Sequence, residues 1–107
     1  MKSISIEELK NKLTTEKELI LVDVLEETDF KKSHIKGAVN IPLKRIATEA
    51  KKRFDKEDLI VVYCSNYNCS ASPTAAKKLE NIGFKNVYDY EGGKKEWENA
   101  GLPMEFN

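Results

Sequence analysis

The chain has 107 residues, with Lys plus Arg and Asp plus Glu numbering 18 each, so its formal net charge at pH 7 is zero. This length suits one compact domain, and we expect a single domain over residues 1–107. The balanced charge creates no overall field that would attract nucleic acid or an anionic membrane, so we expect neither as a partner.

The N-terminus has no apolar run of signal-peptide length, and no later run approaches a membrane span. We therefore predict a cytoplasmic protein. The metal-binding and disulfide-forming residues are sparse, since Cys64 and Cys69 are the two cysteines and His34 is the one histidine. They are too few for a disulfide-built fold or a structural zinc site, and we expect no metal and no cofactor.

Strand and helix patterns alternate along the first half of the chain. A short strand over residues 2–4 precedes a helix whose start is marked by Ser5 and Glu8, the two residues of a capping box. Residues 19–24 form a continuous apolar run rich in β-branched side chains, which indicates a strand buried on both faces. A short strand at residues 38–40 follows, and apolar residues then recur at helical spacing, namely Leu43, Ile46, Ala47, Ala50 and Phe54.

The second half repeats the alternation. Residues 59–63 form the most apolar strand pattern, and Cys64 follows it directly. Ser72 and Pro73 predict a helix start, with Ser72 as the N-cap and Pro73 at the first helical position. A strand at residues 86–90 and a last helix from about residue 94 to residue 99, which buries Trp97, complete the chain.

This order predicts an α/β fold with a parallel or mostly parallel sheet and helices on both of its faces. In such folds the site lies beyond the carboxyl ends of the strands, which is where Cys64 is expected. A polar loop then leads from Cys64 to a helix N-terminus, whose free amides and dipole favour an anion. A thiolate in this setting has a lowered pKa, and loop amides can cradle an anion or a persulfide beside it. The alternative is that Cys64 is only a buried core residue, as cysteines at strand ends often are.

The sequence resembles the rhodanese-like domain family in several motifs that occur in the family's order over nearly the whole chain. The first comprises residues 21–24, Phe30 and residues 34–42, and the second is the strand-end run at residues 61–64. The helix that follows is similar at Ser72, Ala75, Ala76, Leu79, Gly83 and Phe84. The closing motif matches at Gly92, Gly93, Trp97 and residues 100–103.

The resemblance implies a five-stranded, mostly parallel sheet with helices on both faces. It also implies a sulfurtransferase or sulfur carrier, in which Cys64 takes a sulfane sulfur as a persulfide and passes it to a thiol acceptor. The donor is a small sulfur compound such as thiosulfate, or a persulfidated protein. The substrate-binding loop carried over from the family consists of Ser65, Asn66, Tyr67, Asn68, Cys69, Ser70, Ala71 and Ser72.

Two departures from the family pattern concern this loop. The family places five residues between the cysteine and the serine, whereas seven separate Cys64 from Ser72 here, and Ala71 stands where the family has arginine. Leu25 likewise replaces an arginine of the first motif. Because arginine offers fork-like donors to an oxyanion, we expect weak activity with thiosulfate and a better fit for a larger or less charged donor. Lys94 and Lys95 either border the site or form a solvated helix face.

Cys69 lies five positions after Cys64 in the same loop. It is either a resolving thiol, which closes a disulfide with Cys64 after sulfur transfer or oxidation, or an unpaired loop residue. Closure requires the two Cα atoms to lie within about 7 Å.

Two other functions stay open. One is a non-catalytic rhodanese-like interaction or redox-sensing module that uses Cys64 and Cys69. The other is a phosphatase or arsenate reductase, which the longer loop suggests and the missing arginine opposes. We interpret His34 and Asp23 as structural rather than as acid or base catalysts.

Overall fold

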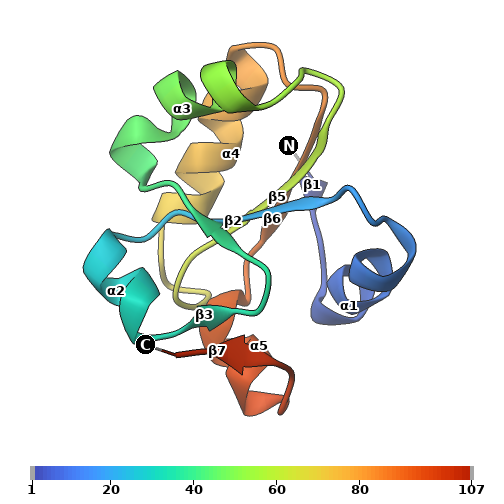
Figure 1. The fold of residues 1–107 in the computed structure, drawn as a ribbon, viewed down its shortest axis with the longest axis vertical. Helices are drawn as coiled ribbons and strands as arrows, with labels where there is room; N and C mark the ends of the chain where they lie inside the picture. Colours follow the sequence, from blue (N-terminus) through green and yellow to red (C-terminus); the bar gives the residue numbers. More distant parts are fainter. Residues whose placement is uncertain (1, 107) are drawn as a thin grey trace.

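Five parallel strands form the central sheet of the computed structural model, which describes residues 2–106 (Figure 1). Their order across the sheet is β1 (Lys2–Ser3), β6 (Asn86–Tyr90), β5 (Leu59–Tyr63), β2 (Ile20–Asp23) and β4 (Val39–Asn40). Every neighbouring pair in this sheet is parallel. The predicted α/β class and five-stranded sheet are therefore confirmed, and the sheet is parallel throughout.

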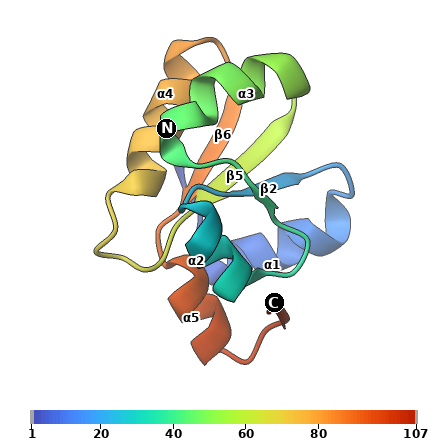
Figure 2. The same ribbon diagram turned by 60° about the vertical axis from the view of Figure 1, so that its left-hand side comes forward.

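Helices cover both faces of the sheet (Figures 1 and 2). On one face lie α3 (Ile46–Arg53), preceded by the short 3-10 helix η1 (Leu43–Arg45), and α4 (Ala71–Asn81). On the other lie α1 (Ile6–Thr15) and α5 (Gly93–Asn99). The helix α2 (Glu27–Lys32) follows β2 and lies beside α5.

Strand β5 divides its side chains between the two cores because successive residues of a strand point to opposite faces. Ile60 and Val62 pack with α3 and α4, whereas Val61 and Tyr63 pack with α1 and α5. Cys64 continues the first set and belongs to the core under α4. The alternation of β5 therefore fixes which way the Cys64 side chain points.

A two-stranded antiparallel sheet, which the sequence analysis did not predict, joins β3 (His34–Ile35) to β7 (Met104–Glu105). Strands of two residues are too short to carry a periodic pattern. His34 belongs to this sheet, where its Nε2 lies 3.2 Å from Glu105 Oε1 and its ring stacks on Phe30. These contacts agree with a structural role for His34.

One of the two predicted helix starts is confirmed and the other is wrong. The Ser5 side chain accepts from the Glu8 amide at 3.1 Å, and the Glu8 carboxylate accepts from the Ser5 amide at 3.0 Å, as in a capping box. In contrast, α4 begins at Ala71 with Ser70 as its N-cap, so Ser72 is a helical residue. Pro73 does not stop the helix there because the first turn needs no amide hydrogen from it.

Candidate active site

Cys64 lies at the carboxyl end of β5, at the edge of the sheet where the fold places a site. Its side chain is 1% exposed and packs among apolar residues under α4. In this disulfide-bonded state Cys64 packs as the buried-core alternative describes, and the thiolate itself stays a prediction for the reduced protein. The physical reason is the strand alternation, which turns Cys64 to the same buried face as Val62.

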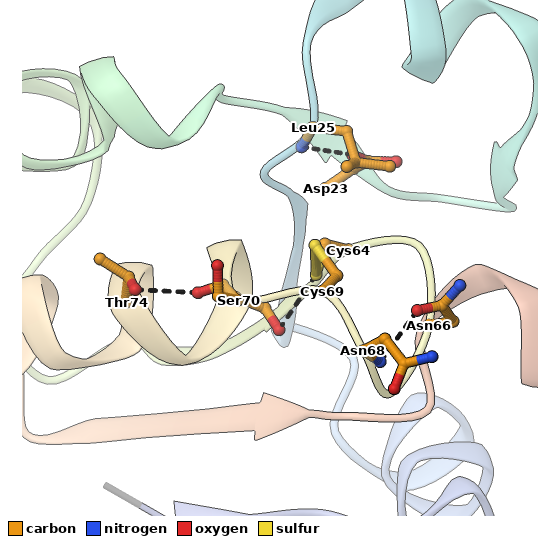
Figure 3. The surroundings of a disulfide bond; sticks show 9 residues. Asp23, Leu25, Cys64, Asn66, Asn68, Cys69, Ser70 and Thr74 are labelled. Atoms are coloured by element: carbon orange, nitrogen blue, oxygen red, sulfur yellow. Dashed lines mark hydrogen bonds between the residues drawn. A yellow bond between two sulfur atoms is a disulfide. The ribbon is translucent and has the colours of Figure 1, made fainter.

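Cys64 and Cys69 form a disulfide, and their Cα atoms are 6.4 Å apart (Figure 3). This distance lies within the range that a disulfide requires, so the geometric condition for pairing is met. Cys69 is only half-buried, whereas Cys64 is buried. Solvent thus reaches the bond from the Cys69 side.

Asn66 organises the turn that brings Cys69 back to Cys64. Its carbonyl oxygen accepts from the Cys69 amide at 3.1 Å. Its side-chain oxygen accepts from the Asn68 amide at 2.9 Å (Figure 3). These two amides are therefore occupied within the loop, and the predicted cradle of amides does not include them. The amides of Ala71 and Ser72 occupy the first two positions of α4, where a helix supplies no partner.

The start of α5 holds the other side of the loop. The amides of Lys94 and Lys95 donate to the carbonyl oxygens of Cys64 and Ser65 at 3.0 and 2.9 Å. Gly93 allows this approach, since it has φ +66° and a Cβ there would lie 2.5 Å from the Cys64 carbonyl oxygen. The sequence analysis noted the pair Gly92 and Gly93, but the close contact of Gly93 with the Cys64 backbone depends on tertiary structure.

The two lysines after Gly93 point to different places. The Lys94 ammonium donates to the carbonyl oxygens of Asp29 and Ser33 at 3.0 and 2.8 Å, so it fixes the end of α2 and does not border the loop. Lys95 is exposed and lines a surface pocket of about 260 Å³ with Asn66 and Tyr67. Of these two cations, Lys95 is the one near the candidate loop.

Tyr67 is the most exposed large side chain of the loop, at 68%. Its hydroxyl donates to the Glu96 carboxylate at 3.4 Å, and the negative charge of Glu96 raises the pKa of Tyr67. The loop therefore presents a neutral phenol beside a carboxylate, and residues 65–72 contain neither Arg nor Lys. Its surface is polar and carries no positive charge of its own.

Two buried carboxyl groups lie near the strand ends. Asp23, at the end of β2, accepts from the Leu25 amide at 2.9 Å (Figure 3). Asp89, near the end of β6, was missed by the sequence analysis because its neighbours give no motif. Burial raises the pKa of both carboxyl groups, which favours their protonated forms. Within residues 2–106 no group of three or more His, Cys, Asp or Glu side chains is placed to hold a metal ion.

The profile of the family described as "Rhodanese-like domain" matches residues 5–100, most of the chain. The chain belongs to the rhodanese-like domain family. It is 29% identical over 85 residues to the "Thiosulfate sulfurtransferase GlpE" of Coxiella burnetii, covering 79% of this chain and 77% of that protein. It is also 32% identical over 94 residues to the "Putative sulfur carrier protein YrkF" of Bacillus subtilis, covering 88% of this chain and 49% of that protein.

The solved structures agree with this membership. The BH2092 protein of Bacillus halodurans superposes with a TM-score of 0.89 at 29% identity, covering 98% of this rhodanese-like chain and 77% of that chain. The chain thus spans about half of YrkF and about three quarters of the GlpE and BH2092 chains. Over residues 2–106, helices that combine the length and apolarity needed to span a bilayer are absent.

Proposed function

We propose that this rhodanese-like domain, residues 1–107, is a sulfurtransferase or sulfur carrier that holds a sulfane sulfur on Cys64. The observation that carries the proposal is the position of Cys64 at the end of β5, with its Sγ 3.5 Å from the Ser72 hydroxyl near the N-terminus of α4. A hydroxyl donor and a helix N-terminus both stabilise a thiolate. The relatives named as thiosulfate sulfurtransferase and sulfur carrier support the same chemistry.

The reaction needs the reduced protein and proceeds in two displacements. The Cys64 thiolate attacks the sulfane sulfur of the donor, forms an S–S bond and expels the rest of the donor, which is sulfite when the donor is thiosulfate. An acceptor thiolate then attacks the outer sulfur of the persulfide. The acceptor leaves with that sulfur as its own persulfide, and the Cys64 thiolate returns.

The persulfide on Cys64 can also react with Cys69. The Cys69 thiolate attacks the Sγ of the Cys64 persulfide, which forms the observed disulfide and expels hydrosulfide. An external dithiol must then supply two electrons and two protons to restore both thiols. We place the protein in the cytoplasm, where such reductants keep disulfides transient.

The charge of the loop selects the donor. Thiosulfate is a dianion, and residues 65–72 offer it no cationic side chain. Lys95 is the neighbouring cation, but it lies on an exposed helix face, where water screens its charge. We therefore expect weak activity with thiosulfate and faster loading from a persulfide donor.

Intact mass measurement tests the proposal. The reduced protein is incubated with thiosulfate or with glutathione persulfide, and Cys64→Ser and Cys69→Ser serve as matched variants. We expect an adduct of about 32 Da on the parent and on Cys69→Ser, and none on Cys64→Ser. An adduct that persists in Cys64→Ser, or none on Cys69→Ser with either donor, contradicts the proposal.

The disulfide itself supports a second candidate, a redox-sensing module without turnover. Such a module needs no ionised thiol in its reduced form. A Cys64 pKa near its unperturbed value of about 8.5, together with slow alkylation, would favour sensing over sulfur transfer.

A further inference from the structure

Apolar side chains lie at the carboxyl ends of the strands, around the buried sulfur of Cys64. Four partly exposed residues there pack against the core that contains Cys64, namely Leu25, Leu43, Cys69 and Ala71. Together they form an apolar rim at this end of the core. Because Cys64 is 1% exposed, a donor that reaches its sulfur must pass residues of this rim.

Backbone hydrogen bonds of Val24 place two rim residues beside Cys64. The Val24 amide donates to the Tyr63 carbonyl oxygen at 3.1 Å, and β2 and β5 are parallel neighbours, so Val24 lies alongside Cys64. The Val24 carbonyl oxygen accepts from the Leu43 amide at 3.1 Å. Leu25 is the next residue in the chain, and Figure 3 draws it among the residues around the disulfide. Both leucines are thus one step from the residue that flanks the sulfur.

The other two rim residues come from the loop and from α4. Cys69 is bonded to Cys64 through the disulfide, and Ala71 is the first residue of α4. The helix η1, which begins with Leu43, packs against α4. The rim therefore combines residues from four separate segments that meet at the end of β5.

The charged residues next to the two leucines are exposed. Glu26 follows Leu25 and Lys44 follows Leu43, and both charged side chains are exposed to solvent. Their charges are opposite, and water screens each of them. An anionic group that packs against Leu25 and Leu43 would therefore lose hydration and gain only a screened charge in return.

Displacement at sulfur determines where the rest of the donor lies. The Cys64 thiolate attacks the outer sulfur of a persulfide from the side opposite the leaving sulfur. Because Cys64 is at the inner end, the leaving sulfur and its carbon chain lie outward, against the rim. An apolar chain is favoured there, since its contact with leucine side chains removes apolar surface from water.

We propose that Leu25 and Leu43 determine donor specificity and that the preferred donor is an alkyl persulfide with an uncharged carbon chain. The inference rests on the proposed function and specifies the class of its donor. The Cys64 thiolate forms a bond to the outer sulfur, and the S–S bond of the donor breaks. The leaving alkyl thiolate takes the electron pair of that bond. The proton of the outer sulfur stays on the new Cys64 persulfide, so protons and charge balance.

Two matched donors test the effect of the carbon chain. The background is Cys69→Ala, which leaves Cys64 as the one thiol and keeps the rim apolar. Loading is followed as a mass increase of about 32 Da, with butyl persulfide or with the persulfide of mercaptopropionate, which carries a carboxylate at the end of a similar chain. Each loading rate is divided by the rate of the same donor with N-acetylcysteine, which removes differences in intrinsic reactivity. We expect the normalised rate with butyl persulfide to be about tenfold higher or more.

Glutamine variants test the two leucines. Leu25→Gln and Leu43→Gln keep the side chains long and make them polar, and each should lower the preference for butyl persulfide about threefold or more. Leu13→Gln is the matched control, because Leu13 is a partly buried leucine of α1 in the other core. It should leave the preference unchanged. The ratio of two donors on one protein does not depend on the folded fraction, so a less stable variant still reports.

Equal normalised rates for the two donors overturn the inference, and Cys64 is still loaded in that case. A preference that both rim variants leave unchanged, or that Leu13→Gln lowers as much as they do, overturns it as well. Loading by neither donor contradicts the inference together with the proposed function, so the two failures are distinguishable.

Discussion

The two sulfur atoms of the loop differ in their access to solvent. Cys64 is buried at the strand end, whereas Cys69 is half-buried on the loop. A reductant or thiol therefore meets Cys69 first, and attack there releases Cys64 as a thiolate beside Ser72. Under the proposed function, this difference in access suits Cys64 to carrying sulfur and Cys69 to closing the disulfide.

Replacing Cys69 separates these two roles. In Cys69→Ser the persulfide on Cys64 has no neighbouring thiolate to expel hydrosulfide. We expect the loaded variant to lose hydrosulfide at least tenfold more slowly than the loaded parent, measured by trapping released sulfide in the absence of an acceptor. Equal rates of release in the two proteins would show that Cys69 does not act on the persulfide.

Gly93 carries a second prediction at the scale of one residue. Gly93→Ala introduces both a positive-φ alanine and a clash with the Cys64 backbone. Gly101→Ala is a matched control, because Gly101 has φ +76° and open space around its Cβ position. We expect urea unfolding to show a loss of about 1–2 kcal/mol for Gly101→Ala and a larger loss for Gly93→Ala. Equal losses of unfolding free energy would contradict the close contact between Gly93 and the Cys64 backbone.

At the scale of elements, β5, the loop and α4 form one unit that positions the candidate site. Strand β5 sets the direction of Cys64, the turn around Asn66 returns the chain, and α4 supplies Ser72. This unit keeps the anion-stabilising helix N-terminus but lacks the cationic side chain that an oxyanion donor needs. A single substitution at the start of α4 should therefore change which sulfur donor the domain prefers.

Ala71→Arg tests this directly. Residue 71 is the first residue of α4 and is partly exposed, so a long side chain there can pack its stem on the surface and keep its guanidinium in solvent. We expect kcat/KM for thiosulfate to rise about tenfold or more, and Ala71→Gln, which is neutral, to change little. If the two variants behave alike, charge at this position does not limit thiosulfate use.

The longer strands and helices could be predicted from the sequence, whereas the short elements α2, β3 and β7 and the contacts between elements could not. The strands Leu59–Tyr63 and Asn86–Tyr90 were predicted to the residue, the first from a continuous apolar run and the second from Val and Tyr, which favour strands. The start of α4 was misplaced since Ser70, Ser72 and Pro73 all resemble helix starts, and tertiary contacts of Ser72 decide among them. The seating of Gly93 against Cys64 and the burial of Asp89 depend on strand order, which no local pattern encodes.

At the scale of the whole molecule, the parallel sheet divides the interior into two cores, and both contain polar groups near the strand ends. Asp89 lies at the α4 side of the sheet, whereas the Tyr63 hydroxyl on the other side accepts from the Ile35 amide at 3.0 Å. The Tyr63 hydroxyl thus has a hydrogen-bond partner, whereas the Asp89 carboxyl oxygens have none within the described residues, and burying an unpaired carboxylate is unfavourable. The contribution of Asp89 depends on pH.

Burial raises the pKa of Asp89 above its unfolded value, so the folded state binds the proton more tightly than the unfolded state. The stability that Asp89 contributes is therefore present at low pH and is lost as pH rises from the unfolded pKa to the folded pKa. We expect the unfolding free energy of the parent to fall relative to that of Asp89→Asn as pH rises from about 4 to 7. Parallel stability curves for the two proteins over this range would contradict a raised pKa.

The central claim is that Cys64 carries a sulfur atom and passes it on. The most direct measurement is a single-turnover transfer, in which the reduced protein is loaded with ³⁴S-labelled persulfide, freed of donor and mixed with a small thiol. The account predicts one labelled sulfur per Cys64 in the acceptor and return of the protein to its reduced mass. It is contradicted if the label stays on the protein, or if it leaves only as hydrosulfide while Cys64 and Cys69 form their disulfide.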